Sequence, residues 1–230
     1  MSPTTLQPPK APKIPYRFEL HEDVRIDDYY WLRERENPEV IDYLNAENAY
    51  TEAVLAPVKE LREKLFAEMK ARIKEQDESV PYKVGNYYYY YRYEQGGEYP
   101  IYSRKYGSFG AEEQVMLDLN QMAGEHTYYN ATFPEISDNE EIAAFGEDTV
   151  SRRLYTLKFK NLKTGEIYPD RVPDTEGGNY AWAADNHTIF YIRKDTTTLL
   201  GYQVWRHRLG TDVSEDVLVY EEADDQFYLG

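Results

Sequence analysis

SDNEEIAAF (residues 137–145) and ADNHTIFYI (residues 184–192) share one pattern, in which a turn built on Asp-Asn leads into an apolar strand. The two copies lie 47 residues apart. At the same offset, matching pairs follow a second expected strand: Leu162 with Leu209, and Thr164 with Thr211. Short strands that recur every 40 to 50 residues or so are typical of the four-stranded blades of a β-propeller. A β-sandwich is the competing architecture, and turn hydrogen bonding explains each Asp-Asn without a catalytic role.

The sequence before this repeat also alternates with the period of two that strands require. Residues 87–93 form an aromatic run, and shorter strands are expected at 100–105 and 114–119, with glycine-containing turns between them. Counting strands from Ser79 to Gly230 gives about three blades, whereas closed propellers have roughly 4 to 8. The sequence therefore predicts the first part of a propeller, ending in an open edge.

The segment before Ser79 has a different character. Five prolines in residues 1–15 predict an extended lead-in. Asn37-Pro38-Glu39 supplies a cap, a first helical residue and a favourable charge, and the helix is expected to run to about Ala56, where Pro57 ends or kinks it. A second helix is predicted from one apolar stripe at helical spacing: Val58, Leu61, Leu65, Met69 and Ile73. Two helices cannot bury such stripes alone, so this arm needs a partner surface.

Composition excludes several classes of function. The chain has 230 residues, a formal net charge of −16 and no cysteine. Phosphate binding needs clustered Lys and Arg, so a nucleic-acid partner is not expected. Disulfides and zinc-thiolate sites are excluded. No apolar run is long enough to span a membrane, and the N-terminus lacks the apolar core of a secretory signal, so we expect a cytoplasmic protein without membrane partner or cofactor.

No residue qualifies as catalytic, cofactor-binding or metal-ligating. A serine nucleophile elbow needs Gly-x-Ser-x-Gly, and Ser108 comes nearest, with Gly110 after it but Tyr106 before it. The four histidines are far apart and form no zinc motif: His21, His126, His187 and His207. The last two are interpreted as surface or packing residues.

Two pairs of adjacent carboxylates could suggest a glycosidase dyad. Glu147–Asp148 and Asp224–Asp225 both lie beside expected turns, so solvated loop faces explain them better. Motif chemistry alone therefore does not identify an activity.

Several segments together resemble the prolyl oligopeptidase family of serine peptidases and, within it, the oligopeptidase B (protease II) branch. The resemblance runs from about Pro12 to the last residue. It rests on IDDYYWLR (26–33), GEYPIYSRK (97–105), VWRHRLGT (204–211), VLVYEE (217–222) and DQFYLG (225–230).

The resemblance implies a mainly β fold, with an N-terminal helical arm (residues 1–77) followed by the first three or so four-stranded blades of a seven-bladed β-propeller (residues 78–230). In that family the arm packs on a C-terminal α/β-hydrolase domain, which is absent from this chain. The Ser, Asp and His triad belongs to the absent part. No catalytic residue can therefore be carried over to any position of this sequence.

The function implied by the resemblance is that of a serine peptidase that cleaves short peptides after Arg or Lys, with the propeller gating access. Its partners would be short basic peptides, and this chain alone is predicted to be inactive. Two alternatives stay open: a non-catalytic propeller fragment that binds other proteins, and a prolyl-specific peptidase of the same family.

Overall fold

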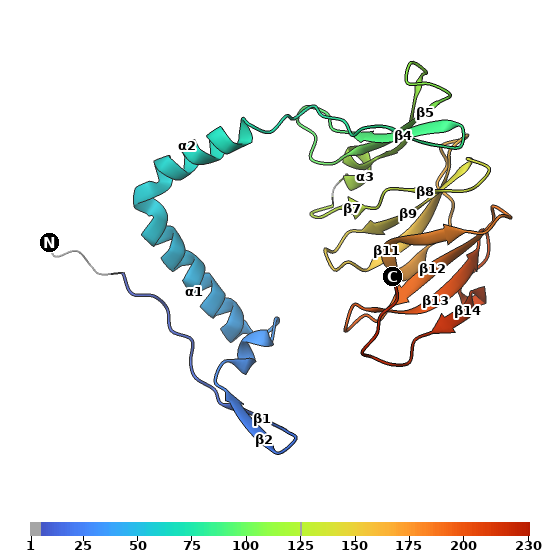
Figure 1. Cartoon of the computed structure of the whole chain (residues 1–230). Coiled ribbons are helices and arrows are strands. Elements are labelled where there is room, and N and C mark those ends of the chain that lie inside the picture. Colours follow the sequence, from blue (N-terminus) through green and yellow to red (C-terminus); the bar gives the residue numbers. More distant parts are fainter. Residues whose placement is uncertain (1–5, 125) are drawn as a thin grey trace. The chain divides into compact units, whose positions relative to one another are not determined.

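The computed structural model describes residues 6–124 and 126–230, and the chain divides into two compact units, Met1–Ile73 and Lys74–Gly230. The first unit holds a hairpin and a helical segment, with η marking a 3₁₀ helix: β1 (Tyr16–Leu20), β2 (Asp23–Asp27), η1 (Tyr30–Arg33), α1 (Pro38–Leu55), η2 (Ala56–Val58) and α2 (Lys59–Lys70) (Figure 1). The second unit is built mainly of strands: β3 (Tyr82–Val84), β4 (Tyr87–Arg92), β5 (Ile101–Tyr106), β6 (Glu113–Asp118), α3 (Leu119–Ala123), β7 (Asn130–Ala131), β8 (Glu135–Ile136), β9 (Ile142–Asp148), β10 (Tyr155–Asn161), β11 (Val172–Trp182), β12 (Thr188–Lys194), β13 (Gly201–Arg208), η3 (Val213–Glu215) and β14 (Val217–Glu221). The mainly β fold with one helical arm is the predicted class.

Helix α1 begins and ends where the sequence predicts. The side chain of Asn37 accepts a hydrogen bond of 2.9 Å from the backbone N–H of Glu39, and Pro38 is the first helical residue. The helix ends at Leu55, and Pro57 lies in the 3₁₀ turn η2 that separates α1 from α2. The cap satisfies an N–H that has no partner within the helix.

Helix α2 ends earlier than the apolar stripe suggests. It stops at Lys70, and the N–H groups of Arg72 and Ile73 bind the carbonyls of Met69 and Lys70. This three-residue spacing is the tighter 3₁₀ pattern that often closes a helix. The prediction that Ile73 continues the helix is therefore wrong.

The arm buries little apolar surface. Within its described part, residues 6–73, only Trp31 and Val40 are buried, and the indole N–H of Trp31 donates to the carbonyl of Pro12. Residues 6–15 form no helix or strand, so the extended lead-in stays a prediction, and Pro3 lies outside the described residues. The stripe is exposed by 41 to 70% at all of its positions: Val58, Leu61, Leu65, Met69 and Ile73. No residue of the described part of the arm, 6–73, therefore buries the stripe.

The first sheet of the second unit is an antiparallel meander in the order β3-β4-β5-β6, which we call blade 1. Its first strand begins after Pro81, which lacks the N–H that a ladder needs. The aromatic run forms β4, and Tyr89 and Tyr90 on it are buried. The run therefore contributes Tyr89 and Tyr90 to the core, whereas Tyr91 and Tyr93 are exposed.

The other strands form one eight-stranded sheet in the order β14-β13-β12-β11-β10-β9-β7, with β8 also paired to β9. Strand β11 belongs to two blades. Val172 and Thr175 of β11 pair with β10, and Thr175 also pairs with Arg193 of β12. Residues 180–182 pair with β12 alone, and the ladder is irregular before them, where Gly178 has φ of +85°. Blade 2 is therefore β7 to β10 with the first part of β11, and blade 3 is the last part of β11 with β12 to β14.

Consecutive blades pack against one another through shared apolar clusters. One cluster joins blades 1 and 2 through Tyr89, Met116 and Leu162. A larger one joins blades 2 and 3: Ile142, Ala144, Leu157, Phe159, Val172, Tyr180, Ile189 and Tyr191. Strands that meander in chain order within each blade are typical of a propeller, whereas a β-sandwich uses connections that cross between two sheets. The propeller prediction is confirmed.

The 47-residue repeat is visible as direct contact between equivalent residues. The N–H of Asn139 donates to the side chain of Asn186 at 2.7 Å, and the indole N–H of Trp182 donates to the carbonyl of Glu135 at 3.1 Å. Each of these pairs is separated by 47 residues. Equivalent turns of blades 2 and 3 therefore lie side by side.

Candidate functional site

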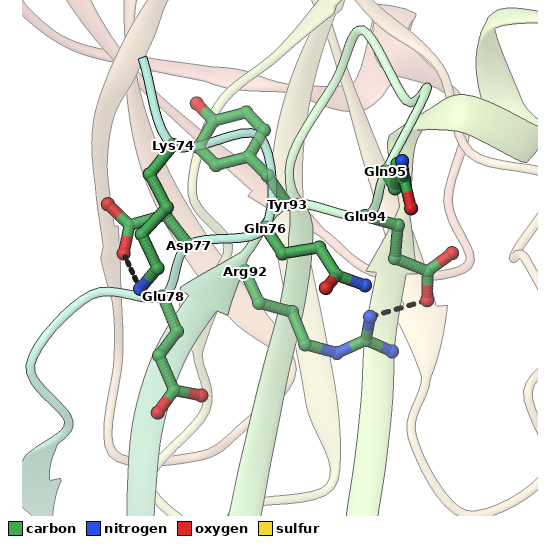
Figure 2. A pocket seen from close by; sticks show the side chains of 8 residues that line it. All are labelled: Lys74, Gln76, Asp77, Glu78, Arg92, Tyr93, Glu94 and Gln95. Carbon is green, nitrogen blue, oxygen red and sulfur yellow. Dashed lines mark hydrogen bonds and ion pairs between the residues drawn. The ribbon is translucent and has the colours of Figure 1, made fainter. Parts of the chain in front are cut away.

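A pocket of about 520 Å³ lies on the second unit, where the chain before β3 runs past the connection between β4 and β5 (Figure 2). It is lined by Lys74, Gln76, Asp77, Glu78, Arg92, Tyr93, Glu94 and Gln95. The two walls are joined by backbone hydrogen bonds, from the N–H of Tyr93 to the carbonyl of Asp77 and from the N–H of Ser79 to the carbonyl of Tyr91. These bonds continue the β3–β4 pairing to residues 77–79 and 91–93, and the pocket lies at this end of the two strands.

Both cationic groups of the pocket are paired with carboxylates. Arg92 binds Glu113 through Nε at 2.8 Å and Nη2 at 3.0 Å, and its Nη1 lies 2.5 Å from Glu94. Lys74 lies 2.9 Å from Asp77, and Figure 2 shows this pair and the Arg92–Glu94 pair. The hydrogen bonds from Arg92 lower the pKa of Glu113 to about 2, so this carboxylate stays ionised.

The remaining polar groups give the pocket an acidic and amide character. They are the carboxylate of Glu78, the amides of Gln76 and Gln95, and the phenol of Tyr93. Such groups can accept hydrogen bonds from a cationic or amide ligand. No serine or histidine is among the lining residues, so the pocket holds no Ser–His pair, and its geometry supports binding.

The residues that came nearest to a catalytic motif lie in different turns and loops. Ser108 is exposed in the turn between β5 and β6. His21 lies in the β1–β2 turn and His187 in the β11–β12 turn, and both are exposed. His126, also exposed, stacks on Tyr129 with ring centroids 5.9 Å apart. The surface interpretation of His187 is therefore correct.

The interpretation of Glu147–Asp148 as a solvated loop face is wrong. Asp148 is buried, and its carboxylate accepts from the N–H groups of Val150, Ser151 and Arg153, so it shapes the β9–β10 loop. On the other face of β9, Glu147 binds Lys158 and accepts a hydrogen bond from the hydroxyl of Tyr129. Strand alternation places the two side chains in separate networks.

The second carboxylate pair behaves as the sequence suggests. Asp224 and Asp225 are exposed in the turn after β14. Asp224 accepts a hydrogen bond of 3.0 Å from the backbone N–H of Gln226, which is a turn contact.

His207 is the functional group that sequence reasoning underestimated. It is fully buried, and its two ring nitrogens face Asp216 and Asp170, 9 and 37 residues away in sequence. A sequence signal exists at the repeat offset, where Lys160 of blade 2 occupies the equivalent position and its Nζ donates to the carbonyl of Met116 in blade 1. Lys160 of β10 and His207 of β13 thus hold equivalent positions, and each contacts the preceding blade.

The described part of the chain contains neither a metal-binding cluster nor a membrane-spanning helix. No group of three or more His, Cys, Asp or Glu side chains in residues 6–124 and 126–230 could hold a metal ion. In the same residues, no helix combines the length and apolar character required to cross a membrane.

Comparison with known proteins identifies the family. Residues 9–230 match the family model for the prolyl oligopeptidase N-terminal beta-propeller domain. The chain belongs to the prolyl oligopeptidase family. Its blades are therefore those of the family's propeller, and the resemblance found in the sequence is confirmed.

Relatives within the prolyl oligopeptidase family include peptidases with different names. The chain is 45% identical to dipeptidyl aminopeptidase BI of Pseudoxanthomonas mexicana, over 97% of this chain and 33% of the relative. It is 40% identical to Protease 2 of Moraxella lacunata, over 96% of this chain and 33% of the relative. The chain spans about a third of the length of these curated relatives.

Solved structures give the same picture. Oligopeptidase B from Leishmania major matches 97% of this chain with 33% identity and a TM-score of 0.88, and the match covers 34% of that protein. Oligopeptidase B from Trypanosoma brucei matches with 26% identity and a TM-score of 0.86, over 97% of this chain and 34% of that protein. The chain is thus similar to the N-terminal third of oligopeptidase B structures.

Proposed function

We propose that this chain is the arm and propeller portion of a serine oligopeptidase that cleaves short peptides after Arg or Lys. The observation that carries the proposal is the similarity to oligopeptidase B over 97% of the chain. In the complete enzyme, residues 1–77 would pack on an α/β-hydrolase domain, which would supply the partner surface that the exposed stripe of α2 lacks. A cytoplasmic location is part of this proposal.

The propeller would act on access and attraction rather than on the chemical step. A propeller that covers an active site admits small, unfolded peptides and excludes folded proteins. The formal net charge of −16 would attract basic peptides at long range, and this attraction would weaken with added salt. The acyl transfer itself would use a serine nucleophile, a histidine base and an oxyanion hole of the hydrolase domain.

A second candidate activity is removal of dipeptides from the amino terminus of peptides. It is favoured by the 45% identity to a relative named dipeptidyl aminopeptidase BI. An enzyme of this kind needs a free amino terminus on its substrate, whereas an endopeptidase does not. The two candidates therefore differ in one property that substrates can test.

The experiment is an assay of the complete protein that contains this chain. We expect an amino-blocked Arg substrate and an amino-blocked Lys substrate to be cleaved at least about tenfold better than the matching Pro substrate. Preference for a free amino terminus would support the dipeptidyl activity instead, and preference for Pro would support the prolyl-specific branch. The isolated 230-residue chain is the control, and it should cleave none of them.

The outcome that contradicts both peptidase proposals is also defined. If the complete protein cleaves no substrate and a serine-directed reagent does not label it, the propeller belongs to a non-catalytic binding protein.

A further inference from the structure

The imidazole of His207 on β13 lies between two buried carboxylates. Nδ1 is 2.7 Å from Oδ1 of Asp216, and Nε2 is 3.0 Å from Oδ1 of Asp170. The side chain of His207 is 0% exposed, and those of Asp216 and Asp170 are 0% and 2% exposed. Phe159 of blade 2 stacks on the ring, with centroids 5.8 Å apart. Three ionisable side chains therefore meet away from solvent.

Both carboxylates are arranged as hydrogen-bond acceptors. The hydroxyl of Tyr191 donates to Oδ2 of Asp216 at 2.8 Å, and the N–H of Gly210 donates to Oδ1 of Asp170. An ionised carboxylate only accepts, and a neutral imidazole carries one N–H only. With both carboxylates ionised, an acceptor at each ring nitrogen requires a proton on each ring nitrogen, and Oδ2 of Asp170 has no hydrogen-bond partner among the described residues.

We propose that His207 is held as an imidazolium that ties blade 3 to blade 2, and that loss of its second ring proton releases the β13–β14 edge. Asp170 lies in the connection from β10 to β11 in blade 2, and Asp216 lies directly before β14 in blade 3. The ring thus joins two blades through one shared positive charge. Removing that charge leaves buried carboxylates without compensation, which is costly.

Position 160 of blade 2 is equivalent to position 207 of blade 3, and its side chain has a different hydrogen-bond partner. Lys160 lies 47 residues before His207, and its Nζ reaches back to the carbonyl of Met116 in blade 1 at 2.7 Å. Burial lowers the pKa of Lys160, and the nearby carboxylate of Asp118 offsets this effect only in part. His207 reaches back in the same way to Asp170 of blade 2, and its other ring nitrogen faces Asp216 of its own blade.

The other charged groups around the ring do not replace it. Arg193 of β12 faces the cluster through the hydroxyl of Tyr191, to which its Nη2 donates at 3.1 Å. Arg206 and Arg208 of β13 and Glu215 of η3 are exposed to solvent, and together with His207 they line a pocket of about 240 Å³. Solvent screens these exposed charges, so the imidazolium is the buried cation beside the two aspartates, and it offsets one of their two negative charges.

The first test detects the ring protons directly by NMR of the 230-residue chain with ¹⁵N-labelled histidine. Only four histidines contribute, and the exposed ones can be assigned by single substitution: His21→Asn, His126→Asn and His187→Asn. The remaining signal belongs to His207, so no core variant has to fold. We expect both ring nitrogens of His207 to carry protons at a pH where the ring of His187 is neutral. A bare ring nitrogen under that condition overturns the proposal.

The second test measures the release of the edge. Amide hydrogen exchange is followed by mass spectrometry as the pH is raised, with correction for the intrinsic rate at each pH. Once the second ring proton is lost, we expect protection in residues 201–221 to fall at least about tenfold while β4 and β5 keep theirs. Unchanged protection of residues 201–221 after loss of that proton overturns the switch. A replacement of His207 by methionine, which removes the charge, should show the low protection at every pH.

Discussion

Leucines on apolar faces differ in burial between the arm and the blades. Leu65 of α2 and Leu157 of β10 each lie on a face that sequence periodicity marks as apolar. Leu157 is 0% exposed, whereas Leu65 is 46% exposed. The difference is the partner: Leu157 packs in the cluster that joins blades 2 and 3, and the described residues provide no such cluster for Leu65.

This comparison separates two kinds of information in a sequence. A periodic pattern shows which face of an element favours burial. It does not show whether the covering surface lies in the same chain. Each blade buries its apolar face against the next blade, because the repeat places a similar sheet beside it. The described residues of the arm, 6–73, contain no second copy of its helices to pack against.

The largest expected effect is a direct contrast between these two leucines. Leu157→Ala should lower the free energy of unfolding of the blades by about 2–5 kcal/mol, because it removes buried contacts and leaves a cavity. Leu65→Ala should change the same quantity by less than about 0.5 kcal/mol. Urea unfolding of both variants measures the contrast. Similar losses for the two variants would mean that the stripe of α2 is packed within this chain.

A close approach of backbone to a ring gives the next effect. A Cβ placed on Gly177 would lie 2.4 Å from the ring of Tyr155, whereas one on Gly110 would meet nothing closer than 4.0 Å. Gly177→Ala should therefore cost about 1–3 kcal/mol through overpacking between blades 2 and 3. Gly110→Ala is the matched control and should be nearly neutral. Thermal unfolding compares the two, and equal stabilities would contradict the packing seen here.

Much of the fold could be predicted because local signals carry it. The turns at Asp138 and Asp185 occupy equivalent places before β9 and β12, since side chains of this kind form tight turns by local hydrogen bonds. The cap at Asn37 is equally local. The early end of α2 at Lys70 was missed, because nothing in the apolar spacing marks a 3₁₀ ending.

The candidate sites could not be predicted in the same way. The Figure 2 pocket depends on residues 74–78 running beside the β4–β5 connection, which is a tertiary relation. His207 looks like an ordinary strand residue until folding brings Asp170 to it from 37 residues away. A carboxylate pair adjacent in sequence, such as Glu147–Asp148, looked solvated because sequence does not reveal the donors that surround it.

Arg92 of the Figure 2 pocket forms an ion pair with Glu113, and this pair predicts a stability that falls in acid. The hydrogen bonds from Arg92 lower the pKa of Glu113 in the folded chain to about 2. The pair therefore stabilises the fold fully above the pKa of a glutamate in the unfolded chain, which is about 4.3. The contribution is lost as the pH falls towards 2. After allowance for solvent screening, Glu113→Gln should cost blade 1 about 1 kcal/mol at pH 7, and the difference from wild type should vanish near pH 2.

A matched control for this prediction is Glu94→Gln. Glu94 contacts the same guanidinium through a single nitrogen, and its side chain is 57% exposed. It should therefore cost less than Glu113→Gln at every pH. Equal losses of stability in the two variants would mean that the two hydrogen bonds from Arg92 to Glu113 stabilise blade 1 no more than the single contact with Glu94 does.

The smallest expected effect lies on the arm and sharpens the comparison from the other side. Lys64 and Glu68 of α2 form an i,i+4 pair with Nζ 3.9 Å from the carboxylate, and their side chains are 74% and 49% exposed. Such pairs contribute about 0.2–0.5 kcal/mol to an isolated helix, and salt reduces this further. Lys64→Gln should therefore speed amide exchange in residues 59–70 by no more than about twofold and leave exchange in β12 unchanged.

Lys59→Gln is the matched control, because Lys59 forms a comparable exposed pair with Glu63 at 3.8 Å. In a demonstrated monomer, slow exchange through residues 58–75 that Lys64→Gln strongly accelerates would mean that the arm is held by the blades. The assignment of its apolar stripe to a hydrolase domain would then fail.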